Sequence, residues 1–296
     1  MRLRSQFTSI LNLSKSLTFR QPTIKFKTFT FPGGEEHIKI EPNKSLHEAN
    51  DIIIATSMNN SAVLIQTLLG TEALRFINPR ARLSLFSPYF PYARQDRRMV
   101  QGEPLSIKVV ANIINSQQYH RVDVLDPHSD VTSSLLNNIN IIDSGNFVKQ
   151  AWRHIQLINP DHVDICLVSP DAGAEKKIYK IAQNLGLDNT LIIRGSKRRD
   201  VKTGKLSNSE FVGDVKGKIC CIFDDMIDGG ATFIQLAKAL KNGGSQKVYL
   251  IVSHGIFSKG LDELKLHLDG VYTTDSFRLM NDEFVKQIPI NTFYPI

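Results

Sequence analysis

The segment FDDMIDGGATF, residues 223–233, places two adjacent carboxylates just before a pair of glycines. Asp224 and Asp225 follow an apolar run and can accept hydrogen bonds from two neighbouring hydroxyl groups. Residues 229–231 leave backbone N–H groups uncovered at the start of a helical pattern, where partial positive charge favours a phosphate. A sugar diol at one end and a phosphate at the other describe a ribose 5-phosphate. A solvated turn with a helix cap is the alternative explanation.

A second segment, YARQDRR, offers the groups that bind a nucleotide. Arg94 and Arg97 stand beside Gln95 and Asp96, and guanidinium groups can form paired hydrogen bonds to phosphate and stack on a base. The chain has no GxxxxGK[ST] sequence, so a bound triphosphate would be held without a P-loop. Taken alone, this segment is more typical of a charged surface than of a binding site.

Two further groups of polar residues follow other apolar runs. His128 in DPHSD and Asp171 in SPDAG can share a Mg²⁺ ion whose remaining ligands are phosphate oxygens; a structural histidine is the alternative. The segment RGSKRRDVKTGK, residues 194–205, is either a solvated loop or a mobile lid that brings Lys197 and Arg199 onto developing phosphate charge.

Short apolar runs rich in β-branched residues alternate with longer helical patterns, which predicts α/β architecture with mostly parallel sheets flanked by helices. The predicted strands are 51–57, 81–90, 121–126, 164–170, 189–195, 218–225 and 247–254, and the predicted helices are 61–76, 105–117, 174–186 and 232–244. In such sheets the functional loops gather at the carboxyl ends of the strands. We expect a basic N-terminal arm (1–24) and two tandem domains (25–148 and 149–296).

Charge and composition exclude several classes of function. The formal charge is +7, but the first 34 residues contain six basic residues and no acid, so the remaining chain holds 30 basic against 29 acidic residues. A nucleic-acid partner is therefore not expected, and no apolar run is long enough to span a membrane. Three cysteines in apolar runs indicate structural thiols in a reducing compartment, and we expect a cytoplasmic protein. The basic N-terminus also resembles a transit peptide in composition, although a poorly ordered or locally packed arm is favoured.

The motifs together resemble a known enzyme family. SPYFPYARQDRRMVQGEPLSIKVVANII, VLDPHSD, LVSPDAGAEKK, SKRRD, GDVKGKICCIFDDMIDGGATFIQLAKALKNGGSQKVYLIVSHGIFS and the earlier FPGGE occur in the order and spacing of the ribose-phosphate diphosphokinases, which make phosphoribosyl pyrophosphate. The resemblance covers roughly residues 28–285. It implies two phosphoribosyltransferase-like halves, dependence on Mg²⁺, ATP and ribose 5-phosphate as small-molecule substrates, and a dimer-based homo-oligomer that can extend to a hexamer.

The resemblance also implies roles for individual residues. It assigns ATP binding to Arg94, Gln95, Asp96 and Arg97, and to Phe31 and Glu35 of FPGGE, which reach the ATP of a neighbouring subunit. It assigns metal binding to His128 and Asp171, and stabilisation of the transition state to Lys197 and Arg199, with His128 included in the catalytic group. It assigns the ribose hydroxyls to Asp224 and Asp225, and the 5-phosphate to Asp228, Gly229, Gly230, Ala231 and Thr232.

The phosphate loop departs from the family pattern. The usual D-T-G-G-T is here Asp228 to Thr232 with the sequence DGGAT, so one hydroxyl donor is missing. A hydrogen bond to a charged group is worth about 1.5–3 kcal/mol, and its loss would matter less for a phosphodiester than for a free phosphate. The same chemistry on a larger acceptor such as ADP-ribose, with a role in NAD salvage, is therefore the main alternative to ribose 5-phosphate.

Two other functions share parts of this pattern. A phosphoribosyltransferase shares the acidic pair and the phosphate loop, but it needs no ATP site such as YARQDRR and SKRRD supply. A catalytically silent regulatory subunit would keep the fold, but it has no need to retain His128, Asp171, Lys197 and Arg199 together.

Overall fold

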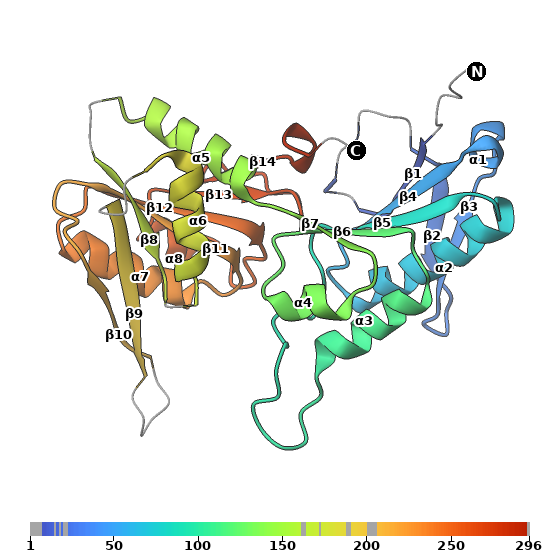
Figure 1. Ribbon diagram of the computed structural model, residues 1–296, viewed down its shortest axis with the longest axis horizontal. Coiled ribbons are helices and arrows are strands. Elements are labelled where there is room, and N and C mark those ends of the chain that lie inside the picture. The colour runs from blue at the N-terminus through green and yellow to red at the C-terminus, as the bar shows by residue number, and fades with distance from the viewer. Residues whose placement is uncertain are drawn as a thin grey trace. The chain divides into compact units, whose positions relative to one another are not determined.

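The computed structural model describes residues 8–14, 16, 17, 19, 23–160, 164–171, 173–187, 191–199 and 206–294 (Figure 1). The chain divides into two compact units. The first runs to Asp143 and includes Ser276–Leu279 and Tyr294, and the second comprises Ser144–Asp275 and Met280–Phe293. Within the described residues, no helix combines the length and the apolar character needed to cross a membrane.

The first unit is built on a parallel sheet of five strands in the order β1-β4-β5-β6-β7. Its strands are β1 (Thr8–Asn12), β4 (Asp51–Ala55), β5 (Arg82–Phe86), β6 (Arg121–Leu125) and β7 (Ile139–Ile142), and its helices are α1 (Lys44–Glu48), α2 (Ser61–Ile77), α3 (Ser106–Ser116) and α4 (Asp130–Leu135). A separate antiparallel hairpin pairs β2 (Phe26–Thr30) with β3 (Glu36–Ile40).

Local sequence explains the elements of this unit. In β4, the residues from Ile52 to Ala55 are all buried, as expected for a central strand covered on both faces. Helix α2 begins where Asn60 Oδ1 accepts the backbone N–H of Val63 at 3.0 Å, which satisfies one of the amides that the first turn leaves open. The strand-to-helix alternation predicted from the sequence is therefore confirmed here.

The N-terminal segment differs from the predicted arm. Residues 8–12 form β1, an edge strand paired in parallel with β4, and Ile10 and Leu11 are fully buried. The sequence prediction missed this strand because its apolar residues are few and lie between basic and hydroxyl-bearing stretches. The predicted boundary at residue 24 therefore separates a strand from the sheet to which it belongs.

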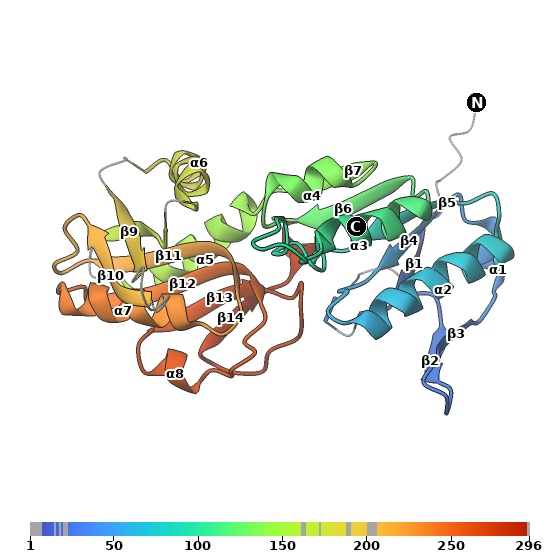
Figure 2. The ribbon, with the colours of Figure 1, turned by 90° about the horizontal axis from the view of Figure 1, so that it is seen from below.

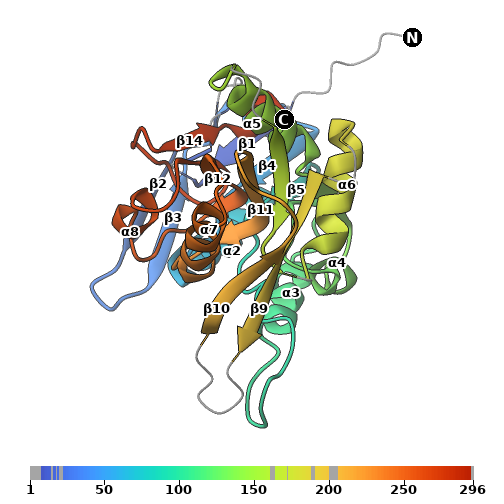
Figure 3. The same cartoon turned by 90° about the vertical axis from the view of Figure 1, so that its left-hand side faces the viewer.

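The second unit contains a sheet of seven strands in the order β10-β9-β8-β11-β12-β13-β14, parallel except for the β9–β10 pair (Figure 3). The strands are β8 (Ile165–Ser169), β9 (Ile192–Arg199), β10 (Leu206–Val212), β11 (Ile219–Ile227), β12 (Lys247–Gly255), β13 (Gly270–Thr274) and β14 (Val285–Ile288). The helices are α5 (Gly145–Leu157), α6 (Glu175–Leu185), α7 (Ala231–Asn242) and α8 (Asp262–Lys265), with a 3-10 turn, η2 (Ile290–Thr292).

Alternation along β11 divides the core of this unit into two layers. Cys220 and Ile222 pack in a cluster with α7, whereas Cys221 and Phe223 pack in a cluster with α5 and α6. Because side chains alternate across a strand, one strand serves both layers. The division between units falls after Asp143 and not at the predicted 148/149, because α5 packs its buried face within the second core.

Candidate active site

The predicted phosphate loop joins β11 to α7 in the second unit. Gly230 is the N-cap of α7 and has a φ of +78°, a left-handed conformation that glycine adopts without strain. Among the described residues, no side chain accepts a hydrogen bond at this cap. An uncapped helix start of this kind is suited to an anion, and phosphate binding here remains a prediction.

The two acidic residues lie inside β11 and not in a turn after it. β11 continues to Ile227, whereas its pairing with β8 ends at Ile222. β12 runs alongside for the extra length, and Asp224 is paired in register with Val252. Asp224 and Asp225 thus stand on a strand that has a neighbour on one side only, and the predicted end of this strand at residue 225 was too early.

The two carboxyl groups of this pair lie close together and are largely buried. Asp225 is 5% exposed, and its N–H donates to Asp224 Oδ1 at 2.9 Å. Burial, followed by the charge of Asp225 and a smaller contribution from Asp171, raises the pKa of Asp224 well above its ordinary value. The negative charges of Asp171, Asp224 and Asp225 therefore repel one another. Hydroxyl donors or a cation would reduce this repulsion.

Asp171 has a structural contact as well as a predicted role in metal binding. Its Oδ1 accepts the N–H groups of Gly173 and Ala174 at 3.0 and 3.2 Å, which stabilises the start of α6. Ser169 Oγ donates to the Asp171 carbonyl at 2.7 Å and fixes the turn after β8. The carboxylate is thus held in a defined place at the carboxyl end of the strand next to β11.

The predicted lid residues begin within a strand. Lys197 and Arg199 belong to β9, where they pair with Ser209 and Leu206 of β10. The prediction of a loop over 194–205 is therefore wrong as far as Arg199, because the chain is extended there and paired at the sheet edge. Their side chains and residues 200–205 lie outside the part of the chain that the structure describes.

The arginine segment follows β5 in the first unit. Phe90 and Ala93 are buried, and between them the chain turns through Tyr92, which has a φ of +60°. This anchoring leaves Arg94 and Gln95 exposed.

Asp96 and Arg97 continue the same segment. Asp96 is half-buried and forms an ion pair with the exposed Arg97, with 3.4 Å between Asp96 Oδ1 and Arg97 Nε. The predicted ATP-binding residues of this segment thus lie on an outward loop with a buried base.

Phe31 and Glu35 lie in the turn of the β2–β3 hairpin, which extends away from the sheet of its unit (Figure 2). Phe31 donates its N–H to the Glu35 carbonyl at 2.8 Å, and its side chain is 43% exposed. Its ring lies 5.0 Å from that of Phe29 and 5.4 Å from that of His37. The sequence analysis did not identify Phe29 and His37 as neighbours of Phe31. The available signal was the alternation of side chains along two short strands.

His128 follows β6 and is exposed. A backbone hydrogen bond from Leu125 to the Pro88 carbonyl, 3.1 Å long, ties this strand end to the start of the arginine segment. Beside His128, Ser129 Oγ and Thr132 Oγ1 are buried and have no hydrogen-bond partner among the described residues. Such groups favour a polar ligand at this strand end, and the sequence reasoning did not identify them.

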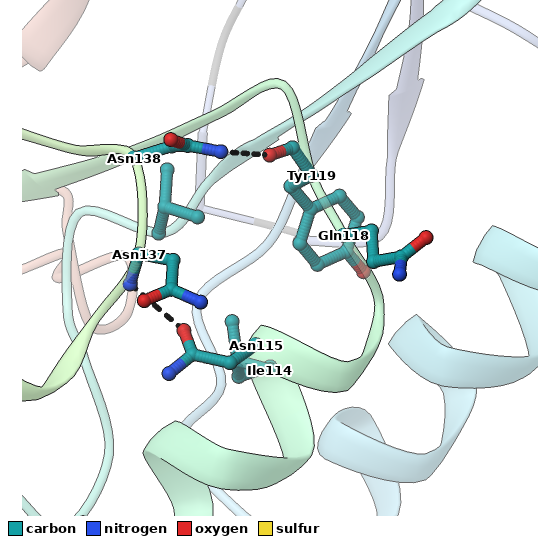
Figure 4. A pocket seen from close by; sticks show the side chains of 7 residues that line it. Ile114, Asn115, Gln118, Tyr119, Asn137 and Asn138 are labelled. Atoms are coloured by element: carbon teal, nitrogen blue, oxygen red, sulfur yellow. Dashed lines mark hydrogen bonds between the residues drawn. The ribbon is translucent and has the colours of Figure 1, made fainter.

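A separate pocket of about 160 Å³ lies at the other end of β6, next to the carboxyl end of α3 (Figure 4). Asn138 Nδ2 donates to the Tyr119 carbonyl at 2.9 Å, and the Asn137 N–H donates to Asn115 Oδ1 at 2.8 Å. Its lining residues, which are Ile114, Asn115, Gln118, Tyr119, Val122, Asn137 and Asn138, include none of the predicted site residues.

Two family models match the chain. Residues 11–117 match the N-terminal domain of ribose phosphate pyrophosphokinase, and residues 167–275 match the phosphoribosyl synthetase-associated domain. A solved structure, phosphoribosylpyrophosphate synthetase from Mycobacterium smegmatis, superposes with a TM-score of 0.80 at 22% identity, covering 96% of this chain and 95% of the other. That likeness establishes the fold.

Curated relatives carry the comparison further. The ribose-phosphate pyrophosphokinase of Nitrosomonas europaea is 31% identical over 85% of this chain and 78% of its own length. The enzyme of the same name from Listeria ivanovii is 30% identical over 87% and 79%, and that of Mycoplasma genitalium is 28% identical over 95% and 86%. With these identities across most of both chains, the protein belongs to the ribose-phosphate pyrophosphokinase family of enzymes.

Proposed function

We propose that the protein transfers the β,γ-diphosphate of ATP to the C1 hydroxyl of ribose 5-phosphate. The C1 oxygen forms a bond to the β-phosphorus, the bond from that phosphorus to the oxygen of the α-phosphate breaks, and AMP leaves with the electron pair. The hydroxyl proton passes to solvent. The observation that carries the proposal is the uncapped start of α7 directly beyond the Asp224–Asp225 pair, on a chain whose curated relatives are named for this reaction.

The residues act by positioning and by charge. In this proposal Asp224 and Asp225 accept hydrogen bonds from the ribose hydroxyls, and residues 228–232 bind the 5-phosphate through backbone amides. Arg94, Gln95, Asp96 and Arg97 bind ATP, and Lys197 and Arg199 stabilise the charge that develops on the transferred phosphates. No covalent intermediate is required.

The donor set fits Mg²⁺ bound mainly through the substrate. Among the described residues, no group of three or more His, Cys, Asp or Glu side chains could hold a metal ion by itself. In this proposal His128 and Asp171 supply ligands to the ion and phosphate oxygens supply the others, which suits a hard cation. Ser129 Oγ, next to His128 in the sequence, has no hydrogen-bond partner among the described residues, which is consistent with a polar ligand there. When bound, the ion neutralises charge on the β- and γ-phosphates.

The proposal extends to assembly and compartment. The exposed aromatic rings at the β2–β3 hairpin, Phe29 and Phe31, support a homo-oligomer in which Phe31 and Glu35 contact the ATP of a second copy. The three free, buried cysteines are compatible with the reducing cytoplasm that we propose as the compartment.

A larger acceptor is the second candidate. The three heavy atoms nearest to a Cβ placed on Gly229 all belong to the side chain of Lys259, at 3.4 Å or more, so the loop leaves room for a small group beside this lysine. ADP-ribose, which carries a phosphodiester at C5, would use that room.

One assay separates these functions. The purified protein is incubated with ATP and Mg²⁺ and with ribose 5-phosphate, ADP-ribose or no acceptor, and AMP release is measured. We expect release that depends on ribose 5-phosphate and stops in excess EDTA. A kcat/KM more than about tenfold higher for ADP-ribose, equal to some 1.4 kcal/mol, would replace the first candidate by the second. The absence of AMP with every acceptor would contradict both, and full turnover in EDTA would contradict the metal requirement.

A further inference from the structure

The turn after β12 is rigidly attached to the end of β11. The N–H of Ile256 donates to the Ile227 carbonyl at 2.9 Å, one residue before the phosphate loop begins. Phe257 is 2% exposed and holds a φ of +50°, and the Gly260 N–H closes the turn on the Phe257 carbonyl at 3.0 Å. A buried aromatic residue in a left-handed conformation persists only where the surroundings fix it. The position of Lys259 within this turn is therefore determined by the fold.

The side chain of Lys259 lies across the phosphate loop. A Cβ added to Gly229 would be 3.4 Å from both Cδ and Cε of Lys259 and 3.7 Å from its Cγ, so the aliphatic stem lies beside the position where a side chain of residue 229 would begin. A side chain at this position would therefore contact the lysine stem. The stem packs on the backbone while the charged end reaches water, as long basic side chains commonly do.

The ammonium group of Lys259 is available for a ligand. Lys259 is exposed, and it forms no hydrogen bond or ion pair within the described parts of the chain, although Asp228 stands one residue from the glycine that it covers. On the other side of Gly229, the start of α7 presents its uncapped amides. A phosphate bound at these amides would place its negative charge near the positively charged ammonium group of Lys259.

From this arrangement we propose that Lys259 binds the 5-phosphate of the acceptor and determines its affinity. The inference deepens the proposed function and rests on it. The loop has Gly229 in place of a hydroxyl donor, and the ammonium supplies three N–H donors and a charge from the adjoining turn. A free phosphate carries more charge than a phosphodiester, so the lysine favours ribose 5-phosphate over ADP-ribose.

Steady-state kinetics of Lys259→Gln test this role. We expect the KM for ribose 5-phosphate to rise about tenfold, while kcat and the KM for ATP stay within twofold, because the lysine contacts the acceptor away from the reacting C1 oxygen. Lys259→Arg keeps the charge and should restore most of the affinity. An unchanged KM for ribose 5-phosphate in Lys259→Gln, or a loss confined to ADP-ribose, would overturn the proposal.

Lys238→Gln provides the matched control. Lys238 is an exposed lysine on α7 of the same unit, well beyond the first turn of that helix. Its replacement removes the same charge from the unit without touching the loop, so the KM for ribose 5-phosphate should stay at the wild-type value. An equal rise in both variants would show a general effect of net charge and would count against Lys259.

Direct binding separates failure of the inference from failure of the proposed function. Calorimetric titration of the wild type and of Lys259→Gln with ribose 5-phosphate and with inorganic phosphate needs no turnover. If ribose 5-phosphate binds Lys259→Gln more weakly than the wild type, but the wild type releases no AMP, the role of the lysine is supported and the proposed reaction is contradicted. If the wild type releases AMP and both proteins bind ribose 5-phosphate equally well, the reaction is supported and the role of the lysine is contradicted. A wild type that neither releases AMP nor binds ribose 5-phosphate would contradict both.

Discussion

Asp224 illustrates how a residue can be unfavourable for the fold and favourable for ligand binding. Its carboxyl group is confined beside Asp225, with Asp171 contributing charge from the neighbouring strand end. For an acid whose folded pKa is raised, the unfolded state releases its proton at lower pH than the folded state does. The free energy of unfolding therefore falls as pH rises from the unfolded pKa towards the folded one.

Replacing Asp224 by asparagine should separate stability from activity. We expect Asp224→Asn to unfold at higher urea concentration than the wild type at pH 8, with the difference disappearing as pH falls towards 4. Its kcat/KM for ribose 5-phosphate should fall about 10- to 150-fold, the equivalent of one charged hydrogen bond of about 1.5–3 kcal/mol. Urea titrations at several pH values and steady-state kinetics measure the two effects.

Asp214→Asn is the control, because the pKa of Asp214 is shifted in the opposite direction to that of Asp224. Asp214 is a surface residue that accepts the Lys216 N–H at 3.0 Å, and this hydrogen bond, helped by the charge of Lys218, lowers the pKa of Asp214. Its replacement should give no gain in stability at pH 8. A similar gain in both variants would mean that the loss of any negative charge stabilises the protein, and that the acidic cluster is not the cause.

At the scale of elements, the start of α7 depends on a single glycine. An alanine at Gly230 would take a left-handed conformation, costing about 1–2 kcal/mol, and its Cβ would lie 3.0 Å from Leu264 Cδ2. We expect Gly230→Ala to lower the free energy of unfolding by at least that amount and to raise the KM for ribose 5-phosphate several-fold, because the amides of α7 would shift.

Gly186→Ala is the matched comparison for this helix start. Gly186 ends α6 with a φ of +69°, and no atom of the described residues lies within 4 Å of its Cβ position. We expect a comparable conformational cost without any change in the KM for ribose 5-phosphate. If the KM rose equally in both variants, the left-handed glycine at α7 would have no special part in phosphate binding.

The sequence predicted central elements well and peripheral ones poorly. The apolar, β-branched segments that became β4, β6, β8 and β12 are covered on both faces, and such burial leaves a strong pattern. The edge strand β1 did not show this pattern, because its few apolar residues are flanked by polar ones.

For the site, the roles of the candidate residues remain predictions, and the sequence did not reveal the local geometry that holds them. The continuation of β11 to Ile227 depends on the partner that β12 supplies, and the contact of Lys259 with Gly229 depends on a turn closed by Phe257. Both arise from residues far apart in the chain, so no local pattern could reveal them.

At the scale of the whole molecule, pH should act on stability through Asp275. This carboxyl is 3% exposed at the end of β13, and its Oδ1 accepts the Ile290 N–H at 2.8 Å. Burial raises the pKa of Asp275 to about 6. The unfolded state therefore loses this proton first, and the contribution of Asp275 to the free energy of unfolding should fall between about pH 4 and pH 6 and then level off.

Comparison with Asp275→Asn isolates this contribution. A shift from 3.8 to about 6 corresponds to roughly 3 kcal/mol at about 1.4 kcal/mol per unit. Asparagine keeps an oxygen for the Ile290 N–H, so we expect the variant to gain stability over the wild type by an amount of this order above pH 6, and by little at pH 4. A pH-independent difference in urea unfolding would show that Asp275 does not titrate in this window.

The placement of two rare residue types gives the second unit its own reporters. The chain has one tryptophan and three cysteines. Trp152 is 4% exposed, and Cys166, Cys220 and Cys221 are free thiols with no exposed surface, all within that unit. A thiol reagent can modify these cysteines only when the second core opens. The rate of thiol labelling under native conditions therefore measures how often that core opens. Indole fluorescence follows the same unit, whereas circular dichroism records both. A difference between the two signals during unfolding would show that the units do not open together.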